Sequence, residues 1–162
     1  MPLAAFEGTG YKIGVFLHVL AVVLAFGPTF AYALFSTVSR TYPRATPALL
    51  EGIQRCDRYL VTPGMLVVIF TALYIQIDGD WDSNETFIGV GFLAFAILLT
   101  LQLSFFTPQV RKAREIAERD LEKGDDLSQE YMDISQRIGK VGSLAGLIIV
   151  VTIFFMTYKP FL

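Results

Sequence analysis

The sequence predicts an all-α integral membrane protein in which four membrane-spanning helices form one bundle. Apolar residues make up 54% of the 162 residues, and the mean hydropathy of the chain is +0.54. A soluble domain of this size rarely tolerates so much apolar surface, because much of it would face water. Four continuous apolar stretches each approach the length of about 20 residues that a helix needs to cross a bilayer. They lack the alternation of polar and apolar residues that membrane barrel strands show.

The four spans are expected to form a single transmembrane domain that covers residues 1–162. Their predicted bounds are residues 11–36, 58–77, 86–106 and 141–158. Each must be helical, since a backbone exposed to lipid has to satisfy its own hydrogen bonds. The first span is not interpreted as a secretory signal, because Glu7 precedes it and its apolar run, Ile13 to Phe35, is longer than the apolar part of a signal peptide.

Basic residues are distributed unevenly between the connecting segments. Eleven of the 13 lysines and arginines lie in the first and third connections, residues 37–57 and 107–140, or at their edges. The second connection, residues 78–85, has four carboxylates and no basic residue, and the termini contribute only Lys12 and Lys159. Basic connections stay on the cytoplasmic side of a membrane. We therefore expect the first and third connections in the cytoplasm and both termini outside, in a bacterial inner (plasma) membrane.

The third connection has a helical pattern of its own. After the third span, apolar residues recur at helical spacing among charged ones, and Gly124 is typical of a helix end. A second helical pattern leads into the fourth span, with Asp126 or Ser128 as its N-cap. These patterns predict an amphipathic cytoplasmic helical hairpin between the third and fourth helices. Its surface over residues 110–138 either binds a partner in a membrane complex or is a solvated extension.

The composition excludes several classes of function. Basic residues alternate with acidic ones and form no stripe, so we expect no nucleic-acid binding. With one cysteine and one histidine, the chain has no intrachain disulfide and little basis for zinc or hydrolytic chemistry. The glycine-rich phosphate-binding motifs do not occur. An enzyme is therefore not the first expectation, and an enzymatic role would require a haem-dependent oxidoreductase.

His18 lies inside the first span, near its outer end. Its helical face carries small residues, Gly14, Ala21 and Ala25, which let a neighbouring backbone or a flat ligand approach closely. Burying an ionisable residue in a membrane is costly, so His18 is a candidate functional residue. A ring nitrogen could bind haem iron or a metal ion, or the neutral imidazole could hydrogen-bond between helices.

Met156 is predicted at a depth comparable with His18, because the fourth span runs from the inner side to the outer side. A histidine and a methionine together suit haem iron or cuprous copper. Methionine is also an ordinary gap-filler in packed helices. The two residues therefore indicate either a metal site or simple packing.

Several glycine, proline and glutamine residues indicate how the helices pack. Gly142 and Gly146 form a GxxxG pattern in the fourth span, which predicts either a homodimer seam or a contact within the bundle. Pro28 lies mid-span and predicts a kink in the first helix, whereas Pro63 is expected in the first turns of the second helix. Gln102, near the inner end of the third span, is expected to make polar contacts between helices.

Three short motifs provide a family resemblance that covers most of the chain. They are Leu17-His18-Val19-Leu20-Ala21-Val22-Val23 with Phe26-Gly27-Pro28, Arg58-Tyr59-Leu60-Val61-Thr62-Pro63-Gly64, and Lys159-Pro160-Phe161. These motifs resemble the bacterial predicted integral membrane proteins grouped as domain of unknown function 2269. More distantly, the layout resembles HemJ-type protoporphyrinogen oxidases and CopD-type copper-resistance membrane proteins.

The HemJ resemblance implies a helical bundle that holds b-type haem through a histidine of the first helix, and His18 matches that histidine. The HemJ pattern also has a lysine in the outer part of the third helix. Here the corresponding stretch, Gly89 to Phe95, contains no lysine, histidine or other ligand.

Three hypotheses about function follow. The leading one is a small polytopic membrane protein that serves as an accessory subunit or a small transport component. The second is a haem-b redox protein with His18 as an axial ligand, in which the face of small residues around Ala21 and Ala25 binds the porphyrin. The third is copper handling through His18 and Met156.

Overall fold

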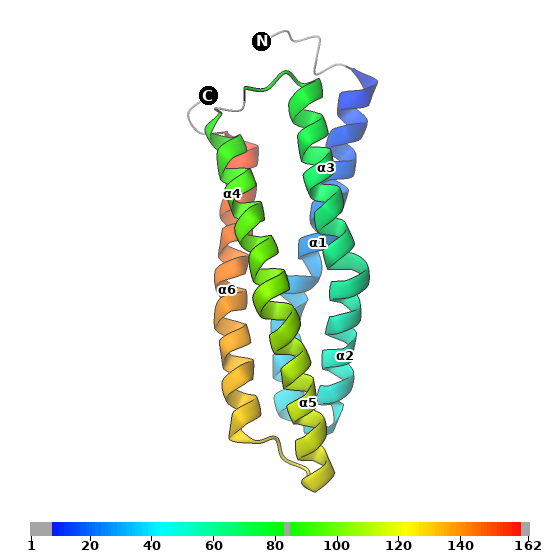
Figure 1. Ribbon diagram of the computed structural model, residues 1–162, viewed down its shortest axis with the longest axis vertical. Coiled ribbons are helices and arrows are strands. Elements are labelled where there is room, and N and C mark those ends of the chain that lie inside the picture. Colours follow the sequence, from blue (N-terminus) through cyan, green and yellow to red (C-terminus); the bar gives the residue numbers. More distant parts are fainter. Residues whose placement is uncertain (1–7, 83–84, 160–162) are drawn as a thin grey trace.

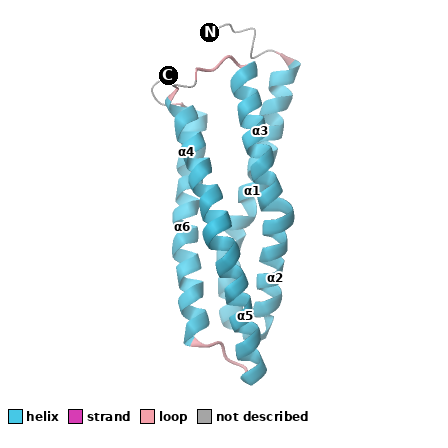
Figure 2. Cartoon of the chain, in the orientation of Figure 1, coloured by secondary structure: helices cyan, strands magenta, loops and turns pink. Residues whose placement is uncertain are grey.

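Helices make up almost all of the structure, a computed structural model that describes residues 8–82 and 85–159. No strand occurs within these two ranges (Figure 2). The α-helices are α1 (Thr9–Thr41), α2 (Thr46–Cys56), α3 (Thr62–Asp78), α4 (Thr86–Leu101), α5 (Thr107–Lys123) and α6 (Gln129–Tyr158). A short 3-10 turn, Pro43–Ala45, precedes α2. Two π-helical segments, Asp57–Val61 and Gln102–Phe106, join α2 to α3 and α4 to α5, so that each pair forms one continuous helix.

Four of the helices described are long and apolar enough to cross a membrane. They cover residues 9–41, 43–78, 86–123 and 129–158. The prediction of an all-α bundle of four membrane helices is therefore confirmed. The start of α1, the α3–α4 turn and the end of α6 lie at one end of the bundle, which we call the termini end (Figure 1). The α1–α2 and α5–α6 turns lie at the opposite end, which we call the hairpin end.

Two apolar clusters hold the bundle together. The membrane cluster joins α1, α3, α4 and α6, and its buried residues are Ala21, Ala25, Val61, Met65, Val68, Leu98, Ala145 and Ile149. The hairpin cluster joins α2, α5 and α6, and its buried residues are Leu50, Ile53, Val110, Ala113, Ile116, Ala117, Tyr131 and Ile134. Outside these clusters large apolar side chains face outward, such as Leu34 and Phe70, each 69% exposed. A bilayer covers such side chains, because lipid tails are as apolar as leucine.

The first connection is more ordered than the sequence predicts. Residues 37–57 are expected as a loop, but α1 continues to Thr41 and α2 follows after a short turn. The loop prediction is wrong because α2 is amphipathic rather than uniformly apolar, so a search for apolar runs misses it. Leu50 and Ile53 of α2 are buried in the hairpin cluster. Pro63 lies in the first turn of α3 as expected, although α3 continues the helix that α2 begins.

The hairpin predicted between the third and fourth spans is present and has the predicted ends. Helix α5 stops at Lys123, directly before Gly124. Ser128 caps α6, where its hydroxyl oxygen accepts a hydrogen bond from the Tyr131 N–H at 3.4 Å. The hairpin does not stand alone, because α2 packs beside α5 and shares the hairpin cluster.

The exposed face of the hairpin is charged. Arg111 and Glu115, one turn apart on α5, form an ion pair at 3.0 Å in which both side chains are exposed. The apolar face of α5 is covered by α2 and α6. The binding of a partner over residues 110–138 stays a prediction. Such a partner would contact a charged surface and not an apolar one.

Asp120 stabilises the turn between α5 and α6, and replacing Asp120 with alanine should destabilise that turn. One carboxylate oxygen accepts the Ser128 N–H at 2.9 Å, and the other accepts the Arg119 guanidinium at 2.9 Å. Without the carboxylate the part-buried N–H loses its acceptor, which costs about 1–3 kcal/mol. Hydrogen exchange at the amides of the turn should accelerate accordingly. Asp125→Ala is the control, since the Asp125–Arg44 pair is exposed and its loss should cost less than about 1 kcal/mol.

Contacts of aromatic residues at the termini end connect α1, α4 and the end of α6. The Nζ atom of Lys159, just after α6, lies 3.9 Å from the ring centroid of Trp81 and 5.0 Å from that of Phe87. The Trp81 indole donates to the Tyr11 hydroxyl at 3.4 Å. Burial lowers the pKa of Lys159, and the nearby Glu85 carboxylate partly offsets this effect. These contacts connect α1, the α3–α4 turn, α4 and the end of α6.

Candidate functional site

A cavity of about 440 Å³ lies between the helices and extends from the membrane cluster to the hairpin cluster. Its volume is in the range of pockets that bind small molecules. Side chains of α1 and α6 form most of its wall, and the other helices and both π segments supply the rest. The larger apolar side chains in the wall include Phe26, Phe30, Met65, Leu98, Phe106 and Ile149. Among the polar groups on the wall are Tyr32, Asp57 and Gln102. Apolar walls with few polar groups suit an amphipathic molecule.

The two π-helical segments place two of these polar residues in the cavity wall. Each segment begins with a buried polar residue, Asp57 at 7% exposed or Gln102 at 6% exposed. In the first segment the Thr62 N–H donates to the Asp57 carbonyl oxygen, five residues earlier. In the second segment the Thr107 N–H donates to the Gln102 carbonyl oxygen in the same way. Such π turns are rare and often occur at functional sites.

A proline after each threonine explains why the helix widens there. Pro63 and Pro108 have no N–H to donate, and their rings would clash with the carbonyl one turn earlier in a regular α-helix. A wider turn relieves the clash without ending the helix. In the second segment the Thr107 hydroxyl also donates to the Gln102 carbonyl oxygen at 2.8 Å.

Asp57 has a hydrogen-bond donor but no counter-ion. The Tyr32 hydroxyl donates to its Oδ1 atom at 3.0 Å. The Gln102 side chain lies next to the carboxylate, and its Nε2 atom is buried without a hydrogen-bond partner among the described residues. No basic side chain pairs with Asp57 in the part of the chain that the structure describes. A buried carboxylate is costly without a positive partner, so the site is suited to a ligand that carries positive charge.

Asp57 and Tyr32 do not stand out in the sequence, and Gln102 is expected there only to make polar contacts between helices. Asp57 falls in the segment assigned to a loop, so its burial is not expected from the apolar pattern. One signal could have found it, because Asp57 and Gln102 each stand five residues before a Thr-Pro pair. This shared spacing marks both π segments.

His18 lies outside the cavity, against α3. Its Nδ1 atom is 3.0 Å from the Thr71 hydroxyl oxygen, which is the interhelical hydrogen bond that the sequence left open as an alternative. The small face around it, with Gly14, Ala21 and Ala25, is buried. A Cβ on Gly14 would meet a tyrosine ring of α3 at 2.7 Å. With α3 packed on this face, the surroundings of His18 do not fit a porphyrin in this arrangement, and its role as a haem ligand stays a prediction.

Met156 packs toward a different helix from His18. A Cβ on Gly91 of α4 would meet the Cε atom of Met156 at 2.1 Å, so the methionine occupies the space beside that glycine. Among the described residues no three His, Cys, Asp or Glu side chains group together in a way that could hold a metal ion. Copper binding by His18 and Met156 stays a prediction.

We expect the purified protein to show no Soret band and His18→Ala to leave its copper content unchanged. The reason is that His18 already has a hydrogen-bond partner on α3 and its small face is filled. The measurement is an absorption spectrum with metal analysis of protein purified in detergent from haem-replete cells. A Soret band that disappears in His18→Ala would instead identify His18 as a haem ligand.

The GxxxG glycines of α6 face the interior of the bundle. Gly142 and Gly146 both line the cavity. A Cβ on Gly146 would lie 3.6 Å from the Phe30 ring, and one on Gly142 would lie 4.0 Å from the Phe106 ring. These positions favour a contact of the two glycines within the bundle. The alternative, a homodimer seam, stays a prediction.

Comparison with known proteins gives one result that decides the family. The sequence profile of the family described as predicted integral membrane protein (DUF2269) matches residues 13–160. The chain belongs to this family. The match to DUF2269 covers the whole cavity wall, and the family resemblance seen in the sequence is confirmed. Of the third motif, residues 160–161 lie outside the described residues.

None of the curated proteins and none of the solved structures compared with the chain matches it. The resemblance to HemJ-type and CopD-type proteins therefore stays a prediction. The family description identifies the chain as an integral membrane protein.

Proposed function

We propose that the protein is a small transport component that binds an amphipathic organic cation in the cavity between its helices. The observation that carries this proposal is the buried Asp57 carboxylate, which lies in the cavity wall and has no counter-ion among the described residues. A cationic ligand would supply the missing positive charge, and the apolar walls would hold its hydrocarbon part.

The other polar and aromatic groups of the cavity suit the same ligand. Phe26, Phe30 and Phe106 line the cavity, and aromatic faces attract cations. The unpartnered Nε2 atom of Gln102 can donate to a carbonyl, ether or hydroxyl oxygen of the ligand. The preferred ligand therefore has a positive group, an apolar body and an oxygen acceptor.

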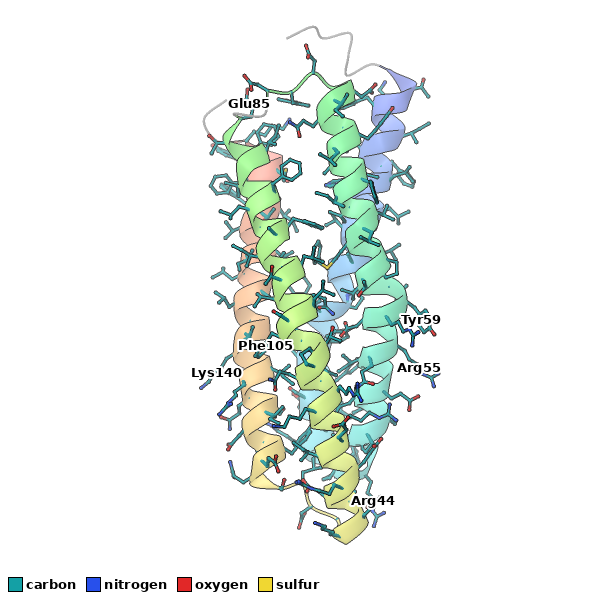
Figure 3. The ribbon with its side chains drawn as sticks, viewed as in Figure 1. Arg44, Arg55, Tyr59, Glu85, Phe105 and Lys140 are labelled. Atoms are coloured by element: carbon teal, nitrogen blue, oxygen red, sulfur yellow. The ribbon has the colours of Figure 1, made fainter. Side chains whose placement is uncertain are left out.

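The proposal includes an orientation, with the hairpin end in the cytoplasm of a bacterial-type cell. Arg44, Arg55 and Lys140 all lie in the half of the bundle toward the hairpin end (Figure 3). The uneven distribution of basic residues along the chain supports this orientation. In this orientation Asp57, next to the start of the second predicted span, lies near the cytoplasmic boundary of the membrane.

The test is binding of tetraphenylphosphonium, a rigid aromatic cation, to the full-length protein in lipid nanodiscs. We expect saturable binding above that of empty nanodiscs, and its loss in Gly146→Phe, because a ring at Gly146 fills the cavity beside Phe30. The matched control is Gly89→Phe, since no atom lies within 4 Å of a Cβ at Gly89. Binding that survives in Gly146→Phe would place the cation elsewhere, and no binding to the wild-type protein would reject a cationic ligand of this kind.

A further inference from the structure

A second pocket lies on the outside of the bundle, where α2 and its π segment meet α5. It is an open pocket of about 450 Å³ lined by Glu51, Gln54, Arg55, Arg58, Tyr59 and Arg114. Figure 3 shows Arg55 and Tyr59 on the same outer side of the continuous α2–α3 helix, pointing away from the bundle. The pocket is thus separate from the central cavity, which lies on the inner side of this helix.

We propose that this pocket binds the phosphate headgroup of an anionic phospholipid. Its three guanidinium groups come from two helices, and planar guanidinium groups bind phosphate oxygens in pairs. Basic pockets between membrane helices are typical sites for anionic headgroups.

The hydrogen-bonding groups of the pocket are only partly used within the protein. Glu51 is the one carboxylate in the pocket wall, and it pairs with both Arg55 and Arg114, the latter at 3.4 Å. Arg114 also pairs with Glu118 at 2.7 Å, so two carboxylates offset the three guanidinium groups. Arg58 makes no ion pair with any described residue and lies over the Tyr59 ring at 5.7 Å. The Nε2 atom of Gln54 is buried without a hydrogen-bond partner. An anion in the pocket would therefore find a net positive charge and an unused donor.

An apolar stripe beside the pocket favours a lipid over a free anion. Tyr59, Leu66 and Phe70 lie at helical spacing along α3 and its π segment, and they are 68%, 53% and 69% exposed. Pro63 is exposed between them. The stripe runs from the pocket toward the termini end, along the part of α3 that crosses the membrane. A lipid whose phosphate occupies the pocket can lay an acyl chain on this stripe.

The proposal is tested by the lipid that the full-length protein retains after exchange with vesicles of phosphatidylglycerol or of phosphatidylcholine. Native mass spectrometry of the protein in detergent measures the bound lipid. We expect phosphatidylglycerol to be retained in preference to phosphatidylcholine, since only the former carries net charge. Each of Arg58→Gln and Arg114→Gln should lower its occupancy about five-fold, the effect of roughly one basic residue at a membrane surface.

The matched control is the double variant Arg111→Gln/Lys112→Gln, which removes two charges from α5 outside the pocket and should retain the lipid. Equal losses in this control and in Arg58→Gln/Arg114→Gln would overturn the proposal, because bulk charge would then explain the binding. Displacement of the lipid by inorganic phosphate would overturn it as well, since the site would then take a free anion. If the glutamine variants fail to fold, Arg58→Lys/Arg114→Lys keeps the charge, and retention should still fall because the paired hydrogen bonds are lost.

Discussion

Replacing Asp57 with asparagine should weaken the binding of an aromatic cation in the cavity by about 30-fold or more. Removing one partner of a buried charge pair costs about 2–5 kcal/mol, and the lower value corresponds to roughly 30-fold in affinity. Asparagine preserves the size of the side chain and can still accept the Tyr32 hydroxyl. The fold should therefore persist, because the substitution removes a buried charge that has no counter-ion within the described residues.

The measurement is tetraphenylphosphonium affinity in nanodiscs, with thermal unfolding of the same samples to confirm the fold. Asp126→Asn provides the control, since Asp126 is an exposed acid in the α5–α6 turn and should bind the cation as the wild-type protein does. Tyr32→Phe separates charge from hydrogen bonding, because it leaves the carboxylate and should change affinity by less than about ten-fold. Undiminished binding in Asp57→Asn would show that the carboxylate does not hold the cation.

The second large effect concerns the closest approach of α1 and α3. Gly64 of α3 lies against Ala25 of α1, and a Cβ at Gly64 would meet the Cβ of Ala25 at 3.0 Å and its backbone nitrogen at 3.1 Å. A leucine at this position cannot be accommodated by a side-chain rotation, because its neighbour is backbone. Gly64→Leu should therefore separate the two helices and lower the free energy of unfolding by about 3 kcal/mol, the upper range for overpacking.

The free energy of unfolding can be measured by titrating the protein in mixed micelles with a denaturing detergent. Gly89→Leu is the matched control, because it makes the same change in a membrane helix where no atom lies within 4 Å of the new Cβ. It should be neutral or slightly stabilising, since glycine is a poor helix former. Equal stability of Gly64→Leu and the wild-type protein would mean that α1 and α3 do not pack as closely as described.

The sequence was sufficient to predict the four membrane helices and the hairpin, because each depends on a local pattern. Apolar length determines a span, and helical spacing of apolar residues determines α5. The ends of the hairpin helices could also be predicted from Gly124 and Ser128, since caps act within one turn. Helix α2 was missed because its apolar face is short and becomes recognisable only beside α5.

The candidate site was beyond the reach of sequence patterns because its residues meet through tertiary packing. Tyr32, Asp57 and Gln102 come from three different helices, and neither their distance nor their burial follows from their spacing in the chain. Asp57 also looks like an ordinary charged loop residue until α2 is recognised as a helix that continues into α3. His18, by contrast, attracts attention as a histidine within a span, whereas its observed partner is a threonine of α3.

The two π segments have a consequence for how this family can vary in length. Each segment closes a hydrogen bond over five residues where an α-helix closes it over four, so losing a single residue there would convert it to a regular turn while the helix continued. The parts of the helix on either side would keep nearly the same orientation, because the wider turn of five residues and a regular turn of four both make a little more than one revolution. Asp57 or Gln102 would then no longer begin a widened turn, which is the turn that places it in the cavity wall. Members that lack a residue between Asp57 and Pro63, or between Gln102 and Pro108, would thus keep the bundle and lose the site.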